Sequence, residues 1–445
     1  MAQLGMERAL DAQWINELFE AESQSQYTRE LLFSTTVEVM SLVALGLRPS
    51  VHAAARSMLE KVPVSLQALY EKLNGSEPEV VRKLVSGSAE RLKPIVQELI
   101  KRQAPTVKGY RLRIVDGNHL PGSQKRLKPL REHRGAALPG QCLVIYDPDL
   151  QLAVDVLPCE DAYAQECVLM KAILRTAQEG DSWIADRAYS SSAILCGLIQ
   201  RGACFLIREH RSCPSPQALG RIRRIGRIDT GVVYEQPVSL KNERGVEHTL
   251  RRIELHLNEP TADGERIVRM LTNAPTALKA KRLAKLYRQR WRIENLFQRL
   301  ESVLHSEVRT LGHPRAALLA FSVALLAYNV LALLQTAVRI RHARSLDKER
   351  IELSTYFIAT EIKANYAGML IAVEAHAWRG YAALNARQLA QHLLMLAGHV
   401  NPRQFRNHPR KPTPPRNKGY VSKRAASSHV STARVLAAAR GPKSP

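Results

Sequence analysis

The sequence predicts a mixed α/β fold, α+β overall, in which helices cover a sheet and a helical region precedes it. Residues 1–105 carry apolar side chains at helical spacing, and several of these segments begin after Ser, Thr or Pro. Residues 106–210 alternate Val-, Ile- and Leu-rich strands with helices, in the order three strands, helix, strand, helix, strand. Residues 211–275 are strand-rich again, without a strong helical pattern. This order predicts a mixed five-stranded sheet with helices on both faces, and a β-rich insertion before the last helices.

The rest of the chain divides into a helical part and a basic tail. Within 276–398 we expect a long charged helix from about Thr276 to Ser302, then an apolar helix and further helices. In the tail, 399–445, the last 45 residues hold eleven Lys or Arg and no Asp or Glu. Such a segment cannot bury enough apolar surface to fold alone, so we predict a disordered arm that adds affinity for phosphates.

The short N-terminal helices admit two interpretations. The connectors GLRPS and VPVS separate helices in a way that is compatible with a helix-turn-helix, and so with a DNA-binding domain over residues 1–105. An ordinary helical bundle explains the same pattern.

One segment is apolar over nearly the length needed to cross a bilayer: AALLAFSVALLAYNVLALL, residues 316–334. It is rich in Ala and is interrupted by Ser322, Tyr328 and Asn329. A helix buried inside a large domain is equally apolar on all sides. We therefore expect a core helix and no membrane partner.

The charge of the chain indicates a polyanionic partner. The 445 residues carry a formal net charge of +24, and the sequence pI is near 10.1. Nucleic acid is the leading candidate, although an anionic membrane surface or an acidic protein also fits the charge. The six cysteines contain no CxxC pair, and the N-terminus has no basic region before an apolar core. These features argue against structural zinc and a signal peptide, and are typical of a protein of the reducing cytoplasm.

Three acidic residues occupy positions suited to metal chemistry. Asp116 follows the strand RLRIV and precedes Gly117, where we expect a sharp turn; Asp186 follows the strand SWIA; Glu294 lies on the long helix. Alone, a strand-end Asp is most often a turn residue, and a helical Glu most often belongs to a surface ion pair. Together, they predict a cage at the strand ends for two Mg²⁺ ions roughly 4 Å apart, as phosphodiester chemistry requires.

Helical phasing adds two residues to this candidate site. At about 100° per residue, Tyr287, Arg290, Glu294 and Glu301 lie within about 60° of one another, beside an apolar stripe. Arg290 can make a forked contact with a phosphate, and Tyr287 can donate its hydroxyl. We therefore predict that this face of the helix binds a nucleic-acid backbone.

The blocks IVDGNHL, WIADRAYSS and YRQRWRIENLFQRL resemble the three catalytic blocks of bacterial DDE transposases of the IS-four (insertion sequence four) family. That family has Tyr, two residues, Arg, three residues and Glu in its third block, and this spacing is present here. DRAY resembles the family's DRGY-like element, with Ala188 in place of Gly. The resemblance covers roughly residues 30–335. At Glu301 the family pattern has Lys, which leaves Arg299 or Arg288 as the cation that contacts DNA there.

The resemblance implies an RNase H-like catalytic domain in which Asp116, Asp186 and Glu294 are catalytic residues and metal ligands. It implies Mg²⁺ as the cofactor, as two ions, with Mn²⁺ as a substitute. In the family, a β-strand insertion domain accounts for the long gap between the second and third acids. Activated water cuts one strand at each transposon end, and the freed 3′-hydroxyl attacks, often through a hairpin, and later joins target DNA.

The resemblance also implies partners and a location. The partners are double-stranded DNA, as transposon terminal inverted repeats and as target DNA, and a second copy of the chain in a homodimer on DNA. The location is the bacterial cytoplasm, in association with the nucleoid. Two other functions remain open: a nuclease that cuts without joining, and a catalytically inactive DNA-binding derivative.

Several neighbouring residues have open roles. Arg187 either contacts a phosphate or forms a surface ion pair, and His119 is either a turn residue or a contact to substrate or metal. We expect Trp291 to pack beside the acids. In the family a Trp of the insertion can hold a flipped base; Tyr234 is the one aromatic residue in 211–275 here.

Overall fold

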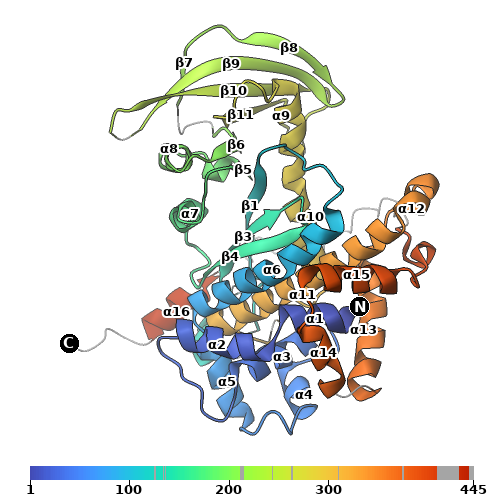
Figure 1. The fold of residues 1–445 in the computed structure, drawn as a ribbon. Helices are drawn as coiled ribbons and strands as arrows, with labels where there is room; N and C mark the ends of the chain where they lie inside the picture. The colour runs from blue at the N-terminus through green and yellow to red at the C-terminus, as the bar shows by residue number, and fades with distance from the viewer. Residues whose placement is uncertain are drawn as a thin grey trace, which may run out of the picture.

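The computed structural model describes residues 1–439 except 125–126, 134, 136, 211–214, 243, 262–263, 309, 373–374 and 408–429. Figure 1 shows three levels: helices from both ends of the chain at the base, strands β1, β3 and β4 above them, and the β-rich insertion at the top. The predicted mixed α/β fold with a helical N-terminal part is confirmed.

The sheet has ten strands in the order β4-β3-β1-β5-β6-β11-β10-β9-β7, and β8 pairs with β9 outside this path. Strands β1, β5 and β6 are parallel, and the other pairings are antiparallel. The strands are β1 (Arg111–His119), β3 (Gln141–Asp147), β4 (Leu152–Cys159), β5 (Asp181–Ala185), β6 (Cys204–Arg208), β7 (Gln217–Ala218), β8 (Arg223–Ile228), β9 (Gly231–Lys241), β10 (Glu247–Leu257) and β11 (Ile267–Thr272). A small second sheet pairs β2 (Ala137–Leu138) with β12 (Val430–Ser431).

Helices surround this sheet. The α-helices are α1 (Ala2–Ala9), α2 (Ala12–Glu22), α3 (Phe33–Ala44), α4 (Val51–Arg56), α5 (Leu66–Gly75), α6 (Pro78–Ile100), α7 (Glu166–Leu174), α8 (Ser192–Gln200), α9 (Ala280–Tyr287), α10 (Trp291–Ser302), α11 (Pro314–Arg341), α12 (Ala343–Glu349), α13 (Thr355–Ala372), α14 (Arg379–Ala382), α15 (Ala386–Ala397) and α16 (Thr432–Ala439). Short 3₁₀ segments are η1 (Lys128–Glu132), η2 (Arg187–Tyr189), η3 (Arg288–Arg290), η4 (Ala375–Trp378) and η5 (Pro402–Phe405).

The insertion continues the main sheet rather than forming a sheet of its own. The five strands expected before residue 211 are β1, β3, β4, β5 and β6, and they are adjacent in the sheet. Strand β11 then pairs with β6, with Met270 opposite Arg208 and Thr272 opposite Leu206. Backbone hydrogen bonds therefore connect the insertion directly to the strand next to the one that leads to Asp186.

Each face of the sheet has its own hydrophobic core. On one face, α7 and α8 cover side chains that include Trp183, Tyr189 and Phe205. On the other face, α11 packs against β4, α6, α3 and α1 in a single core that extends from Leu4 to Ala397. The helices of residues 1–105 thus share a core with the sheet.

Helix α11 fills the centre of this second core. Among the described residues it is the one helix long and apolar enough to cross a membrane, and its most apolar stretch is 100% buried by the rest of the protein. Helices α3, α6 and α15 and strand β4 all contact it. The segment predicted to be a core helix therefore lies in the core.

Asn329 explains one polar interruption in this apolar helix. Its side-chain oxygen accepts a hydrogen bond from the backbone N–H of Ala153 at 2.8 Å, and its Nδ2 donates to the carbonyl of Ala153 at 2.8 Å. Ala153 lies on β4, the edge strand of the sheet, and both residues are fully buried. The amide supplies the partners that a covered strand edge otherwise lacks.

Asn329→Ala should lower the free energy of unfolding by about 2–4 kcal/mol, because two buried backbone groups lose their partners. Chemical denaturation measures this change. Ser322→Ala is the matched control in the same helix: the Ser322 hydroxyl is buried without a hydrogen-bond partner, so its removal should cost less than about 1 kcal/mol. Equal losses for the two variants would contradict this role of Asn329.

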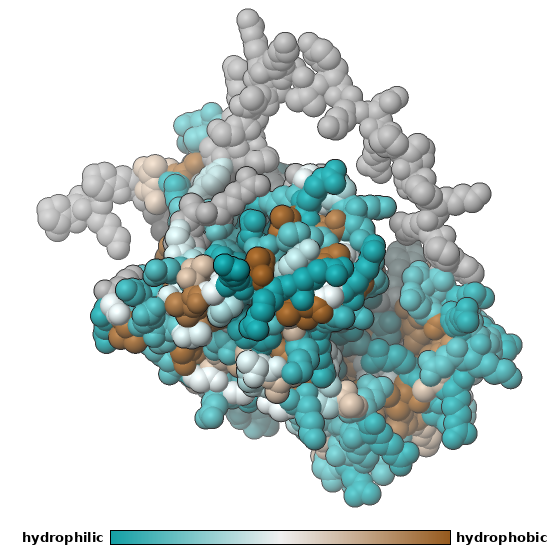
Figure 2. Space-filling model, turned by 90° about the horizontal axis from the view of Figure 1, so that it is seen from above, coloured by the Kyte–Doolittle hydropathy of each residue, from teal (hydrophilic) through white to brown (hydrophobic). Residues whose placement is uncertain are grey.

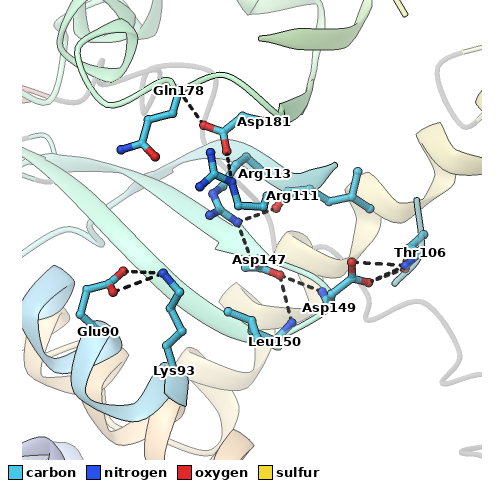
Figure 3. Close-up of polar contacts among 11 residues, drawn as sticks. Glu90, Lys93, Thr106, Arg111, Arg113, Asp147, Asp149, Leu150, Gln178 and Asp181 are labelled. Atoms are coloured by element: carbon cyan, nitrogen blue, oxygen red, sulfur yellow. Dashed lines mark hydrogen bonds and ion pairs between the residues drawn. The ribbon is translucent and has the colours of Figure 1, made fainter. Parts of the chain in front are cut away.

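Ion pairs fix the end of β1 that lies away from Asp116 (Figure 3). The Arg111 guanidinium pairs with Asp181 of β5 at 3.0 Å, and Arg113 pairs with Asp147 of β3. Asp147 also accepts the backbone N–H of Leu150 at 3.0 Å, which closes the turn between β3 and β4. Strand β1 is therefore held in register with both of its neighbours.

Two local expectations about the candidate site are wrong. Asp116 does not end its strand: it pairs with Val144, and β1 continues to His119 along β3. Gly117 makes no turn, because this antiparallel partner keeps the chain extended. The helix expected from Thr276 to Ser302 begins at Ala280 and is interrupted by η3 between α9 and α10.

Part of the C-terminal tail is ordered, so the prediction of a wholly disordered tail is wrong. Strand β12 pairs with β2, and α16 packs against η1. Arg434 pairs with Asp161 at 2.8 Å and lies over the ring of Tyr163. This piece does not fold alone; it adds a strand to an existing one and buries Ser431 and Thr432. Residues 408–429 and 440–445 lie outside the described residues.

The outer part of the insertion is basic. Viewed from above, the molecule presents a mostly hydrophilic face with separate hydrophobic spots (Figure 2). On β8, the side chains of Arg223, Arg224 and Arg227 are exposed, and so is Ile225 between them. This composition is typical of a surface that meets a polyanion.

Candidate functional site

The register of the sheet places Asp116 and Asp186 at the same level. Strands β1 and β5 are parallel, with Ile114 opposite Ile184 as the last pair. Asp116 follows Ile114 by two residues within β1, and Asp186 follows Ile184 by two residues, directly after β5 ends at Ala185. Because side chains alternate between the faces of a sheet, both carboxylates lie on the face of these isoleucines, which is the face that α11 covers.

Helix α10 brings the third acid to this face through Arg290. The Arg290 guanidinium donates to Asp116 Oδ2 at 3.0 Å and contacts Glu294 Oε1 at 2.6 Å. All three side chains are mostly buried, with 12% of Arg290, 19% of Asp116 and 29% of Glu294 exposed. One cation therefore links the strand to the helix.

The 3₁₀ segment η3 aligns Tyr287 with Arg290. A 3₁₀ helix has about three residues per turn, so residues three apart lie on one line along it. Among the described residues, the buried Tyr287 hydroxyl has no hydrogen-bond partner. Burial raises the pKa of Tyr287 above its ordinary range, and the nearby charge of Asp186 raises it further.

The electrostatic neighbours of Arg290 include all three acids. Burial alone would lower the pKa of the Arg290 guanidinium. Tyr287, Asp116, Asp186 and Glu294 together raise it above its ordinary value. Two of these carboxylates, Asp116 and Glu294, contact Arg290 directly, and Asp186 acts on its charge from further away.

These carboxylates offer the oxygen donors that Mg²⁺ prefers. Among the described residues, the buried Asp186 Oδ1 has no hydrogen-bond partner, and the Arg208 guanidinium, 3.8 Å away, compensates its charge. In the described part of the chain, however, no three His, Cys, Asp or Glu residues are gathered closely enough to hold a metal ion. Arg290 is the cation that bridges Asp116 and Glu294 instead.

The other predicted phosphate contacts lie in ion pairs or away from the acids. Arg187 pairs with Glu265 at 3.1 Å, as the ion-pair interpretation expected, and Arg288 pairs with Asp229 at 2.5 Å. Arg299 is half-buried further along α10, where its charge acts on Tyr146.

The remaining candidates are at the surface or in the insertion. Trp291, expected to pack beside the acids, begins α10 with 61% of it exposed, and the Arg290 guanidinium lies over its ring at 5.8 Å. His119 is exposed at the end of β1, and Glu301 is exposed on α10. Tyr234 packs against His256 of β10, with ring centroids 4.4 Å apart.

Sequence reasoning missed Arg208 and Glu265. Arg208 ends the strand CFLIR at the level at which Asp186 follows SWIA, and its guanidinium lies 3.8 Å from Asp186. The equal spacing within two parallel strands was a usable signal. Glu265 lies in the turn between β10 and β11 and contacts both Arg208 and Arg187; no sequence pattern indicated it.

Comparison with known families identifies the protein family of the chain. A model of the transposase DDE domain matches residues 107–330. The chain belongs to the DDE transposase domain family. The match begins just before β1 and ends within α11, so this transposase domain includes Asp116, Asp186, Glu294 and the whole insertion. Comparison with curated proteins gave no match. The mixed sheet and its helices agree with the RNase H-like arrangement of a transposase DDE domain.

Proposed function

We propose that this protein is a cut-and-paste DNA transposase of the IS-four type, which cleaves transposon ends and joins them to target DNA. The observation that carries the proposal is that Asp116 on β1 and Asp186, directly after β5, each follow one of the paired isoleucines by two residues, and that Arg290 links Glu294 to Asp116. A helix that crosses two strand-borne acids gives three carboxylates in a rigid frame, which phosphodiester chemistry needs.

In this proposal Asp116, Asp186 and Glu294 are the catalytic residues and hold two Mg²⁺ ions, with Mn²⁺ as a substitute. When bound, the ions lower the pKa of the attacking water and neutralise charge on the phosphate. The oxygen chemistry of the three carboxylates supports this ligand role, since Mg²⁺ prefers hard oxygen donors. Arg290 then leaves the carboxylates and turns its two donors toward the DNA.

The chain's own residues orient the substrate. The forked guanidinium of Arg290 holds non-bridging phosphate oxygens, and the sheet keeps the two aspartates in fixed positions. Arg187 and Arg208, beside Asp186, contact the neighbouring phosphates, and Arg288 and Arg299 contact the backbone further along the helix.

The partners in this proposal are double-stranded DNA and a second copy of the chain. Terminal inverted repeats are the first substrate and target DNA is the second, and a homodimer holds two ends together in the bacterial cytoplasm. The net charge of +24 and the exposed arginines of β8 support a DNA partner. The helices of residues 1–105 are the proposed recognition domain for the repeats.

A strand-transfer assay tests this function. Full-length protein is incubated with Mg²⁺ and a labelled fragment that carries the inverted repeats flanking its own coding segment. We expect nicks at the repeat ends, followed by covalent joining of the labelled 3′ ends to a plasmid target. Products that are cut but never joined would favour a nuclease, and binding without cleavage would favour an inactive derivative.

A further inference from the structure

A cavity of about 1050 Å³ opens beside Asp186, between β6, β10, β11 and the turn that joins the last two strands. Among the described residues that line it are five arginines and three glutamates, and Ile267 is the one large apolar side chain in that set. Pockets for small molecules are mostly apolar. The lining of this cavity instead suits an extended, strongly hydrated anion.

The glutamates hold the arginines of the cavity in ion pairs. Arg252 makes a forked pair with Glu209, at 2.8 and 2.6 Å. Arg269 pairs with Glu254 at 3.0 Å. These five guanidinium groups face only three glutamate carboxylates. The described lining residues therefore carry an excess of positive charge.

Glu265 differs from the other two glutamates because it contacts two arginines next to the acid centre. It pairs with Arg187 at 3.1 Å and with Arg208, whose guanidinium also lies 3.8 Å from Asp186. Its backbone N–H is held by Thr261 Oγ1 at 3.1 Å, within the turn between β10 and β11. A short turn therefore places one carboxylate over both cations.

We propose that this cavity binds the phosphodiester backbone of the strand that leaves the acid centre, and that Glu265 masks Arg187 and Arg208 until DNA displaces it. The inference rests on the proposed function for its ligand. Phosphate oxygens match the forked donors of arginine as a carboxylate does, but a DNA strand offers several in a row. Glu265 thereby reduces affinity for stray anions and for DNA that does not reach Asp186.

The test compares DNA affinity in Glu265→Gln and wild type, with full-length protein, EDTA and a duplex that lacks terminal repeats. Fluorescence anisotropy over a range of KCl gives the affinity and its salt dependence. We expect Glu265→Gln to bind roughly threefold to tenfold more tightly, since two partly buried arginines lose a competing partner. Glu247→Gln is the matched control: it removes one negative charge from exposed β10, outside the cavity.

Arg187→Ala is the second variant in this test. Because 44% of the Arg187 side chain is exposed, the substitution should leave the fold intact. The affinity of the Arg187→Ala variant for DNA should fall, and the slope of log affinity against log salt should flatten by about 0.9 for one lost phosphate contact. In the Arg187→Ala background the gain from Glu265→Gln should shrink. Thermal unfolding of each variant verifies folding.

Two results would overturn the inference: a Glu265→Gln affinity that changes no more than that of Glu247→Gln, or an Arg187→Ala slope equal to the wild-type slope. Either can occur while strand transfer succeeds, so the cavity inference can fail alone. If Glu265→Gln tightens binding but no DNA is ever cleaved, the masking stands and the transposase proposal fails.

Discussion

Asp116→Asn, Asp186→Asn and Glu294→Gln should each abolish cleavage and joining, with single-turnover rates at least about 10³-fold below wild type. Each change preserves the size of the side chain and removes one negative charge from the group around Arg290. The three carboxylates act together, so the loss of one should cost nearly as much as the loss of all. Rates are measured in Mg²⁺ at saturating DNA that carries the repeat ends.

Glu301→Gln is the control for these variants, since it changes an exposed carboxylate two turns further along the same helix. Its cleavage rate should stay within about threefold of wild type, in line with a surface charge. DNA binding by the acid variants should also persist, because the basic surface supplies most of the affinity. Full cleavage by any of the three would remove that residue from the catalytic centre.

Arg290→Ala has the second largest expected effect, a loss of about 10²-fold in cleavage rate at saturating DNA. The alanine removes the forked donor proposed to hold the phosphate and leaves Asp116 and Glu294 without their shared partner. The cleavage rate of Arg290→Lys should lie between those of Arg290→Ala and wild type, since lysine keeps the charge but cannot make two parallel contacts.

Arg292→Ala is the matched control for Arg290. Arg292 is the second residue of α10 and donates to the carbonyl of Pro148 at 2.8 Å, away from the acids. Its loss should leave the cleavage rate within about threefold of wild type. If the two alanine variants lose activity equally, the effect comes from disruption of helix α10 and not from contact with phosphate.

The order of elements was predictable because it depends on local patterns. Val-, Ile- and Leu-rich runs between Gly, Asp and Pro mark β1, β3, β4, β5 and β6 correctly. What the patterns could not give was the partner of each strand. The extension of β1 past Asp116 depends on β3, and the joining of the insertion to β6 depends on β11; both are long-range pairings that leave no periodic signal.

The candidate acids were predicted from their places after strands and on a helix, and the sheet register places Asp116 and Asp186 two residues after the paired Ile114 and Ile184. The sequence did not predict which cation pairs with the acids. A cage of carboxylates repels itself, and the nearest cation relieves that repulsion; sequence spacing does not show that Arg290 does so. The exposure of Trp291 follows from where η3 ends, which is likewise a tertiary effect.

The buried helix α11 has a consequence for protein synthesis. Helices α3 and α6 are made first, yet their apolar faces pack on a helix that begins more than 200 residues after α6 ends. At roughly 5–20 residues per second, a ribosome leaves those faces uncovered for about 10–40 s. A message that stops before Pro314 yields a chain without its central helix, which chaperones and proteases would meet as unfolded. Truncated copies of this gene should therefore leave no folded fragment to compete for DNA.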